Sequence, residues 1–319
     1  MRSRNADTAE KVKALTDKLE TGVKAVFESE QYKAYMKAMA KFHRYSFNNV
    51  MLILMQCPNA TAVAGFNTWK RQFGRTVKKG ESGIQILAPV PYKRIVESVK
   101  LDPVTKAPVL DANGKPVTET EYVVQQSYKI AYVFDVSQTE GRELPSYGAE
   151  ELTGNVQNYD SMLKAITELV PVPVVFSEPD GNARGRYVHS EQKIYLDSGM
   201  SQIDTISILI HETAHAILHA LPVKDGVVVG KPEKSRRTRE VEAESIAYIV
   251  CQHFGIETGD SAFAYISKWS RDKELEELKT SLDCISRTSA EMIDAIESCM
   301  PEMSRSQDKP EMSEKYFSR

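Results

Sequence analysis

A helical metal-binding motif is the sequence feature that most constrains the fold. The segment Ile206–Leu218 reads ISILIHETAHAIL, in which apolar residues surround the pattern His-Glu-x-x-His. Four helical residues advance about 6 Å and turn just over once, so His211 and His215 project from one face, close enough to hold one Zn²⁺. Glu212 then points toward the position of a metal-bound water, where a carboxylate can act as general base. Because unpaired polar groups in an apolar interior cost free energy, the segment predicts a zinc centre.

A catalytic zinc needs a third protein ligand, and the segment TREVEAESIA at 238–247 offers three glutamates. Glu240 and Glu244 lie one helical turn apart and share a face, whereas Glu242 points elsewhere. We predict that Glu240 binds the metal and that Glu244 lies behind it, orienting a zinc-bound histidine through its free N–H. Helical phase alone does not fix which face looks inward, so Glu242 and Glu244 stay open as alternatives.

His219 continues the four-residue spacing of the motif. It lies about 12 Å along the helix axis from His211, so these histidines cannot all bind one ion. We expect His219 to be packed and hydrogen-bonded. A zinc peptidase also uses a group that stabilises the oxyanion. The candidates, among which the sequence does not choose, are Tyr187, His189, Tyr195 and Tyr248.

Charge divides the chain into two unlike halves. The 319 residues are 41% hydrophobic and 27% charged, which is typical of a soluble globular protein of about two domains. Residues 1–100 hold 18 basic and 8 acidic residues, a net charge of +10, and the remainder therefore has a net charge of −13. This asymmetry predicts a basic module for an anionic partner joined to an acidic module with another task.

Apolar segments and cysteines indicate the compartment. The longest apolar run, Val50–Met55, is too short to span a bilayer, and the first residues are polar. We therefore expect a cytoplasmic protein that does not contact membranes. The four cysteines show no metal-ligand spacing and are expected to be reduced.

The basic module has a composition that suits single-stranded DNA. Ten basic residues and one acidic residue lie between Lys37 and Arg94, with aromatic residues interleaved. Basic side chains can follow a phosphate backbone and aromatic rings can stack on unpaired bases. The alternative is that the aromatic residues form a core beneath a solvated charged face. We expect Phe66 and Phe73 in the core and Trp69 on a base. The candidate DNA-binding residues are Tyr45, Asn49, Trp69, Lys70, Arg71, Arg75, Lys78 and Lys79.

Periodicity predicts an α+β fold with two domains. Residues 1–147 are predicted to form an α+β domain, residues 148–300 a largely helical domain with a small sheet, and residues 301–319 a disordered tail. A boundary is expected in the linker at 144–151, and Ser201 with Asp204 is expected to cap the metal helix. The predicted helices are 6–43, 48–56, 155–169, 261–269 and 273–296; the predicted strands are 84–89, 128–136, 172–176, 186–189 and 193–197; residues 96–122 are predicted to form a long hairpin or mobile insertion, and residues 222–237 a basic loop.

Four segments of the first half resemble a known family. They are Tyr45-Ser46-x-x-Asn49, Val63-Ala64-Gly65-Phe66-x-Thr68-Trp69, Gly74-Arg75-x-Val77-Lys78-Lys79-Gly80-Glu81-x-Gly83-Ile84 and Val133-Phe134-Asp135-Val136-x-Gln138-Thr139-x-Gly141. This set resembles the amino-terminal domain of the ArdC-type antirestriction proteins carried by bacterial mobile elements. The resemblance implies binding of single-stranded DNA and protection of entering DNA from host restriction.

The second half resembles the zincin-like metallopeptidase domain of the same family, which is akin to that of the IrrE-type regulators. The resembling residues are His211-Glu212-x-x-His215, Glu240-x-x-x-Glu244 and Tyr265-Ile266-x-x-Trp269. The resemblance implies a Zn²⁺-dependent peptidase. The chain departs from the pattern in the Pro-containing insertion near 98–120 and in the basic loop at 222–237, and both departures bear on the shape of the substrate groove.

These observations support one principal hypothesis and two alternatives. The principal hypothesis is an antirestriction-type protein that binds single-stranded DNA and uses Glu212 as general base beside a zinc held by His211, His215 and Glu240. Its protein substrate would be a restriction enzyme or a regulator. One alternative is a non-catalytic single-stranded-DNA-binding protein with a structural zinc. The other is an IrrE-like regulatory protease that cleaves a repressor.

Overall fold

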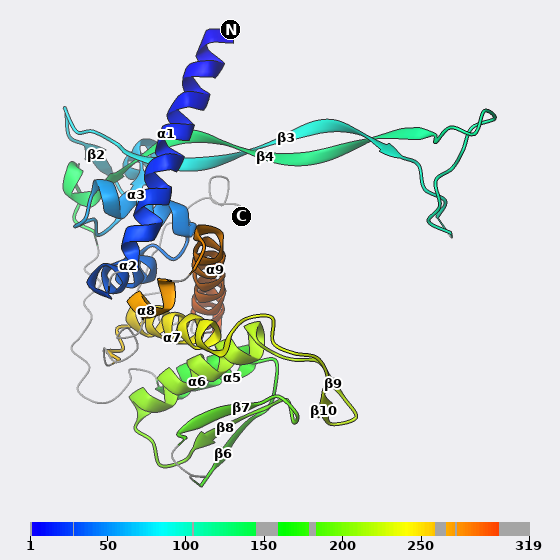
Figure 1. The fold of residues 1–319 in the computed structure, drawn as a ribbon. Helices are drawn as coiled ribbons and strands as arrows, with labels where there is room; N and C mark the ends of the chain where they lie inside the picture. The colour runs from blue at the N-terminus through cyan, green and yellow to red at the C-terminus, as the bar shows by residue number, and fades with distance from the viewer. Residues whose placement is uncertain are drawn as a thin grey trace.

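The structure, a computed structural model, describes residues 2–27, 29–103, 105–144, 159–178, 183–258, 266–271 and 273–299. The predicted linker at 144–151 lies almost entirely outside these residues, and the predicted tail at 301–319 lies wholly outside them. The described residues form a mixed arrangement of helices and small sheets (Figure 1), which confirms the predicted α+β class.

Three helices and a long β-ribbon form the N-terminal part. The helices are α1 (Arg2–Val26), α2 (Ser29–Lys41) and α3 (Phe47–Gln56), so the predicted single helix at 6–43 is two helices. Short elements follow in the order β1 (Val63–Gly65), α4 (Phe66–Arg71) and β2 (Arg75–Val77). The ribbon consists of β3 (Ile84–Val99) and β4 (Thr118–Asp135), and the 3₁₀ turn η1 (Val136–Gln138) and β5 (Thr139–Gly141) complete this part.

The β3–β4 ribbon takes up the segment predicted as a hairpin or mobile insertion. The two strands pair antiparallel from Ile84 opposite Val133 to Val99 opposite Thr118. The base of the ribbon is buried against α3 and β1, whereas from Val90 outward the residues of β3 are mostly exposed. The ribbon consequently projects from the body of the protein (Figure 1). Both predicted strands of this region are therefore much longer than the sequence indicated.

The C-terminal part places helices on a three-stranded sheet. Its elements are α5 (Tyr159–Leu169), β6 (Val174–Ser177), β7 (Gly185–Val188), β8 (Lys193–Asp197), α6 (Gln202–Leu218), β9 (Val223–Lys224), β10 (Val227–Val228), α7 (Arg236–His253), α8 (Ile266–Ser270) and α9 (Leu275–Cys299). The sheet order is β6-β8-β7, with β8 parallel to β6 and antiparallel to β7. Helix α6 packs on this sheet, and α7 packs on α6 from the other side (Figure 1).

A glycine allows β7 to lie directly against α6. A Cβ atom added at Gly185 would come within 2.3 Å of Cγ2 of Ile208 and 3.4 Å of Cγ of Glu212. Any larger residue would push the strand away from the helix, because packed interiors leave no room for such an overlap. Gly185 therefore brings the β7 backbone next to the acidic residue of the motif.

The hydrophobic core continues from the N-terminal helices into the C-terminal ones. Buried residues of α1, α2 and α3 belong to the same cluster as those of α6, α7 and α9. A buried hydrogen bond of 2.7 Å joins the hydroxyl groups of Tyr32 on α2 and Ser245 on α7. The α7 helix therefore packs against both the metal-motif helix and the N-terminal helices. In the described part of the chain, no helix is both long and apolar enough to cross a membrane.

Candidate metal centre and nucleic-acid surface

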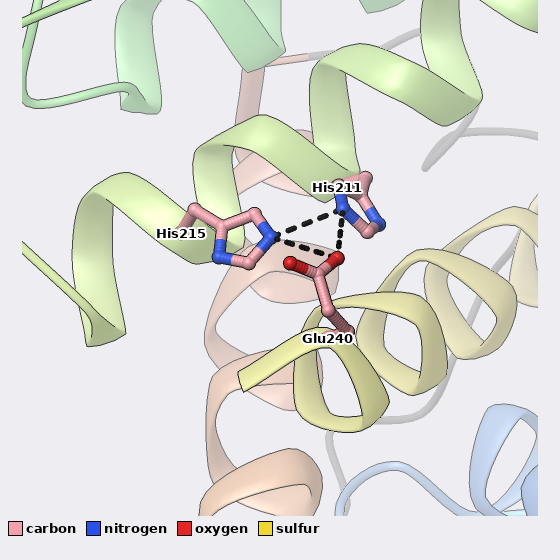
Figure 2. Close-up of side chains that lie close together, drawn as sticks. All are labelled: His211, His215 and Glu240. Carbon is pink, nitrogen blue, oxygen red and sulfur yellow. Dashed lines mark hydrogen bonds and ion pairs between the residues drawn. The ribbon is translucent and has the colours of Figure 1, made fainter. Parts of the chain in front are cut away.

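Three side chains from two helices converge at one point, and we call them the ligand cluster: His211, His215 and Glu240 (Figure 2). The Nε2 atoms of the two histidines are 3.1 Å apart, and each lies 3.6 Å from Oε2 of Glu240. Two imidazole nitrogens and one carboxylate oxygen are ligands that zinc prefers. The donor set and its spacing therefore fit a single divalent ion.

Helical geometry explains this convergence. Ser201 caps α6 by accepting a hydrogen bond from the backbone N–H of Asp204, as predicted, so the helix begins one turn before its apolar stretch. Ser235 caps α7 by accepting a hydrogen bond from the N–H of Thr238, which places Glu240 in the second turn. The histidine side chains are 17% and 13% exposed and that of Glu240 is 47% exposed, so the cluster is accessible from solvent.

The charges of the cluster depend on one another. The imidazoles of His211 and His215, each 3.6 Å from the carboxylate, hold the pKa of Glu240 far below its ordinary range. Burial alone would lower the pKa of His211, but the neighbouring carboxylates Glu240, Glu244 and Glu212 raise it above its ordinary value. Without a metal, Glu240 therefore stays negatively charged and His211 favours its protonated form. The proton on His211 takes the place that a metal cation would occupy.

Glu212 lies on the side of α6 that faces the sheet. It is 8% exposed, and its carboxylate accepts a hydrogen bond from the backbone N–H of Tyr187 on β7. Burial raises the pKa of Glu212 above its ordinary value. A carboxyl group held by one backbone donor in a largely apolar environment is suited to take up a proton.

Glu244, which the sequence predicts to orient a zinc-bound histidine through its free N–H, lies near His211 but does not form that hydrogen bond. Its Oε1 atom is 4.0 Å from Nδ1 of His211. This distance is longer than a hydrogen bond, so Glu244 acts on His211 through charge in this structure.

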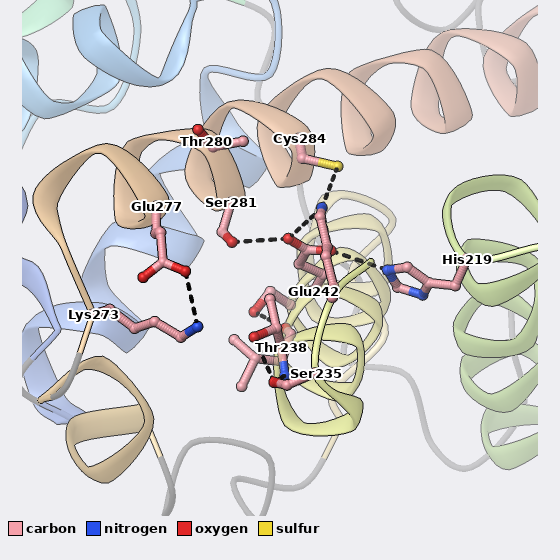
Figure 3. A network of polar contacts seen from close by, with 12 residues as sticks. His219, Ser235, Thr238, Glu242, Lys273, Glu277, Thr280, Ser281 and Cys284 are labelled. Carbon is pink, nitrogen blue, oxygen red and sulfur yellow. Dashed lines mark hydrogen bonds and ion pairs between the residues drawn. The ribbon is translucent and has the colours of Figure 1, made fainter. Parts of the chain in front are cut away.

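A buried polar network lies on the far side of His215, as Figure 3 shows from His219 onward. Nδ1 of His219 is 3.0 Å from Nδ1 of His215, and Nε2 of His219 is 3.0 Å from Oε2 of Glu242. The Glu242 carboxylate also accepts hydrogen bonds from Lys234, at 2.8 and 2.9 Å, and from Ser281, at 2.8 Å. His219 is thus packed and hydrogen-bonded, as expected. The roles of Lys234 and Ser281 were not visible in the sequence.

This network stabilises a charge in the core. The side chain of Glu242 is fully buried. Burial alone would raise the pKa of its carboxyl group, but the hydrogen bonds from His219, Lys234 and Ser281 hold it below its ordinary value. Burial lowers the pKa of His219. Glu242 is therefore an ionised acceptor and is turned away from the ligand cluster, as the helical phase indicated.

The structure separates the four oxyanion candidates. Tyr195 donates a hydrogen bond to Glu191 and is turned to the outer face of the sheet, beneath Arg186. Tyr248 is 3% exposed on α7 and lies in the core. Tyr187 and His189 pack ring to ring, with centroids 4.7 Å apart.

His189 has the surroundings expected of a group that contacts substrate. Burial, then Arg239, His215 and His219, lower its pKa, so the neutral imidazole is favoured. Its Nδ1 atom and Nε of Arg239 are buried without a hydrogen-bond partner. Buried polar atoms are normally paired, so these two are available to a ligand beside the cluster.

A second group of histidines and carboxylates lies between the N-terminal helices and α9. His43 is 3.6 Å from Asp294, and Nε2 of His253 is 2.9 Å from Glu297. The guanidinium group of Arg44 lies 3.8 Å from Asp294 and 3.6 Å from Glu297. Because Arg44 already supplies the positive charge, this group is an ion-pair network that joins the N-terminal helices to α9.

Several predicted DNA-binding residues are in the core. Trp69 is 1% exposed, and its indole N–H donates to the carbonyl of Phe134 at 2.8 Å, so the prediction that it stacks on a base is wrong. Tyr45 is 3% exposed, and its hydroxyl donates to the carbonyl of Val63. These aromatic residues belong to the core because β4 and β1 cover them, which is a long-range contact that composition cannot reveal.

Two further candidates, Asn49 and Arg75, form hydrogen bonds with neighbouring strands. The amide of Asn49 donates to the carbonyl of Leu87 and accepts from its N–H, at 3.0 and 2.9 Å, and so completes the edge of β3. The guanidinium of Arg75 binds the hydroxyl and the carbonyl of Thr139 on β5, at 2.7 and 3.0 Å. Asn49 is 7% exposed and is therefore not available to a nucleic acid, whereas Arg75 is half-buried and its guanidinium is held by β5.

Three accessible aromatic rings near α4 and the base of the ribbon form what we call the aromatic strip: Phe66, Phe134 and Tyr132. Phe66, predicted in the core, is 50% exposed and contacts Phe134 edge to face, at 6.2 Å between centroids. Tyr132 is 54% exposed. A Cβ atom at Gly83 would lie 3.0 Å from Cβ of Tyr132 and 3.1 Å from Cζ of Phe134. Gly83 therefore leaves room for the rings to lie against the turn before β3.

Four of the predicted basic side chains are exposed on α4 and on the turn after β2. Lys70 and Arg71 are exposed at the end of α4, the helix that begins with Phe66. Lys78 and Lys79 are exposed on the turn after β2, and the ammonium of Lys78 donates to the carbonyl of Ser137 at 2.8 Å. These four positions keep the accessibility that a phosphate contact requires.

Residues 7–134 match the family model described as the N-terminal domain of anti-restriction factor ArdC. The chain carries an ArdC-type N-terminal domain. The aromatic strip and the base of the ribbon therefore lie within the ArdC-type domain, and the ligand cluster lies outside the matched residues.

Other similarities extend over more of the chain. An uncharacterised protein of Bacillus anthracis, pXO2-81, is 29% identical over 94% of the chain, which spans 54% of that relative's length. The DNA primase TraC of Escherichia coli is 28% identical over 66% of the chain and 14% of the primase. The metal-free and Mn(II)-bound crystal structures of antirestriction protein ArdC from plasmid R388 align with TM-scores of 0.46 and 0.45, at 18% and 17% identity. They cover 81% and 80% of this chain, and 85% and 84% of theirs.

Proposed function

We propose that the ligand cluster binds one Zn²⁺ and that the site hydrolyses a peptide bond. The observation that carries this proposal is the convergence of His211, His215 and Glu240 on one point, with Glu212 buried beside it. A bound zinc supplies Lewis acidity toward water and toward a carbonyl oxygen. Within the described residues the cluster has three protein ligands. This number is typical of catalytic zinc, whereas structural zinc usually has four, so the cluster favours the enzyme over a structural metal.

The surrounding side chains have distinct roles in this proposal. Glu212 takes the proton of the attacking water, since its carboxylate is held by the Tyr187 N–H on the face of α6 next to the cluster. The unpaired Nδ1 of His189 and Nε of Arg239 contact the substrate carbonyl or the negative charge that develops on it. The β7 strand, brought close by Gly185, presents an edge along which an extended peptide can lie.

We propose that the ArdC-type domain binds single-stranded DNA through the aromatic strip. Phe66 and Tyr132 are half exposed; Phe66 contacts Phe134, and Phe134 and Tyr132 both lie against Gly83. Exposed basic residues on α4 and on the turn after β2 can contact phosphates, while the rings stack on bases. In this proposal Phe66 and Tyr132 take the role that the sequence had indicated for Trp69.

Together these sites support an antirestriction role on a mobile element. DNA binding would keep the protein on entering single strands, and the peptidase would act on a restriction enzyme or a regulator. The test is to incubate zinc-loaded protein with purified restriction-enzyme subunits, with and without a chelator. Cleavage that is lost with chelator and in Glu212→Gln supports the proposal. Cleavage that persists in Glu212→Gln contradicts the assigned base.

The Glu212→Gln variant also identifies the substrate class. Because it should keep zinc and lose turnover, it can retain an uncleaved protein partner. Capture of a restriction subunit supports the antirestriction role, whereas capture of a repressor supports the regulatory alternative. No zinc binding by the wild-type protein would contradict the metal centre itself.

A further inference from the structure

The hydrogen bonds that link His215, His219 and Glu242 determine which ring nitrogen of each histidine carries a hydrogen. Glu242 is fully buried and meets three donors: His219, Lys234 and Ser281. A carboxylate surrounded by donors acts as an acceptor only. Nε2 of His219 must therefore carry a hydrogen that it donates to Oε2 of Glu242.

The assignment then passes from ring to ring. A neutral imidazole carries one hydrogen, so Nδ1 of His219 has a lone pair and accepts from Nδ1 of His215, 3.0 Å away. Nδ1 of His215 is thus protonated, and its Nε2 has the lone pair. That nitrogen is the one directed at Nε2 of His211 and Oε2 of Glu240.

Burying Glu242 with Lys234 and His219 costs stability, which indicates that these residues do more than fill the core. A buried ion pair usually contributes less stability than apolar side chains of the same volume would. Here Lys234, 35% exposed and just before α7, reaches a carboxylate in the core instead of solvent. His219 is 5% exposed and could be replaced by an apolar ring if only volume mattered.

We propose that His219, Glu242 and Lys234 act as a positioning relay that fixes the tautomer and the ring orientation of His215, so that its Nε2 lone pair faces the metal. Lys234 holds the charge of Glu242, Glu242 fixes His219, and His219 fixes His215. The inference rests on the proposed metal function of the ligand cluster. It assigns positioning roles to residues outside the motif, one of them in the basic segment before α7.

The test uses His219→Phe, which removes the acceptor for His215 and leaves Glu242 paired with Lys234 and Ser281. Long-range ¹H–¹⁵N spectra of the histidine rings in the metal-free protein report which nitrogen carries the hydrogen. In the wild type we expect His215 to be protonated at Nδ1 and bare at Nε2, and in His219→Phe to populate both tautomers. Zinc affinity, measured by competition with a chelator, should fall about 10- to 100-fold.

A second variant covers the case in which His219→Phe fails to fold. The double variant Glu242→Gln with Lys234→Met removes both charges together, so no unpaired charge is left in the core. We expect this protein to fold, to mix the tautomers of His215 and to lose zinc affinity to a similar extent. Ser281→Ala is the matched control, because it removes one hydrogen bond to Glu242 but leaves the chain from His215 to Glu242 intact. Its zinc affinity should stay within about twofold of the wild type.

Two results would overturn the relay: a His215 tautomer that is unchanged in both variants, or zinc affinity that is unchanged in both. A purely structural role would lower the melting temperature of the metal-free protein and leave the tautomer as it was. The tautomer is measured without metal and without substrate. Absence of peptidase activity, or of zinc binding by the wild type, would therefore contradict the proposed function and leave the relay to be judged by the spectra.

Discussion

The ligand cluster on α6 and α7 is held by helices, whereas the aromatic strip lies where α4 meets the base of a ribbon. His211 and His215 are spaced by the turn of one helix, and Glu240 is placed by the packing of a second helix on it. Phe66, Phe134 and Tyr132 depend on contacts between β4 and segments that lie about 50 to 70 residues earlier. Local geometry thus determines two of the three ligands of the first site, whereas tertiary packing determines the whole of the second.

The largest effect should come from Glu212→Gln at the helix-borne site. The amide cannot take a proton from water, so hydrolysis should fall about 10²- to 10⁴-fold. His211, His215 and Glu240 are unchanged, so zinc stoichiometry should stay at one per chain. The measurement is single-turnover cleavage alongside metal analysis. Loss of zinc together with activity would show that Glu212 is itself needed to hold the cluster.

Trp69→Ala should reveal a structural role in the ArdC-type domain. The indole is 1% exposed, packs on Phe73 at 4.8 Å between ring centroids and donates to Phe134. Removing it should lower the free energy of unfolding by about 3–5 kcal/mol, as measured by urea denaturation. A fully stable variant with weakened DNA binding would return Trp69 to the role that composition suggested.

The ligand cluster and Trp69 show which features the sequence could predict and which it could not. The four-residue spacing of His211 and His215 specifies their geometry once a helix is assumed, whereas the phase of the next helix leaves Glu242 and Glu244 open beside Glu240, because phase alone does not fix which face looks inward. The burial of Trp69 depends on Phe134, far along the chain, so composition could not choose between core and surface. Gly83 was a possible signal, because a glycine before a strand can mark a close approach of rings.

Non-local partners explain the rest of what was missed. Lys234 and Ser281 reach Glu242 from the segment before α7 and from α9, and no spacing rule connects them. The length of the β3–β4 ribbon was underestimated because its outer part lacks the alternation of a half-buried strand. Its burial pattern is exposed on both faces, so no core imposes a period on the sequence.

Substitutions in the aromatic strip should have an intermediate effect. Phe66→Ala and Tyr132→Ala should each weaken binding to single-stranded DNA by about 1–3 kcal/mol, as measured by fluorescence anisotropy. Tyr122→Ala is the matched control, because Tyr122 is 71% exposed on the outer ribbon, away from the strip. An equal loss of DNA affinity in all three variants would indicate that the DNA binds along the ribbon. Unchanged affinity in Phe66→Ala and Tyr132→Ala would contradict binding through the aromatic strip.

The smallest graded effect should be the pH dependence of zinc affinity. Burial opposes a proton on His211, but Glu240, Glu244 and Glu212 raise its pKa above the ordinary value of 6.5. The proton must leave before the nitrogen can bind a metal. Affinity should therefore be highest above that raised pKa and should fall up to about tenfold per pH unit below it. Glu244→Gln removes one of the raising charges while leaving the three ligands, so its decline should begin at a lower pH than in the wild type. An affinity that stays flat between about pH 5 and 8 would show that zinc does not compete with the His211 proton. If zinc affinity declines over the same pH range in the wild type and in Glu244→Gln, the metal centre stands, but Glu244 does not contribute to the pKa of His211.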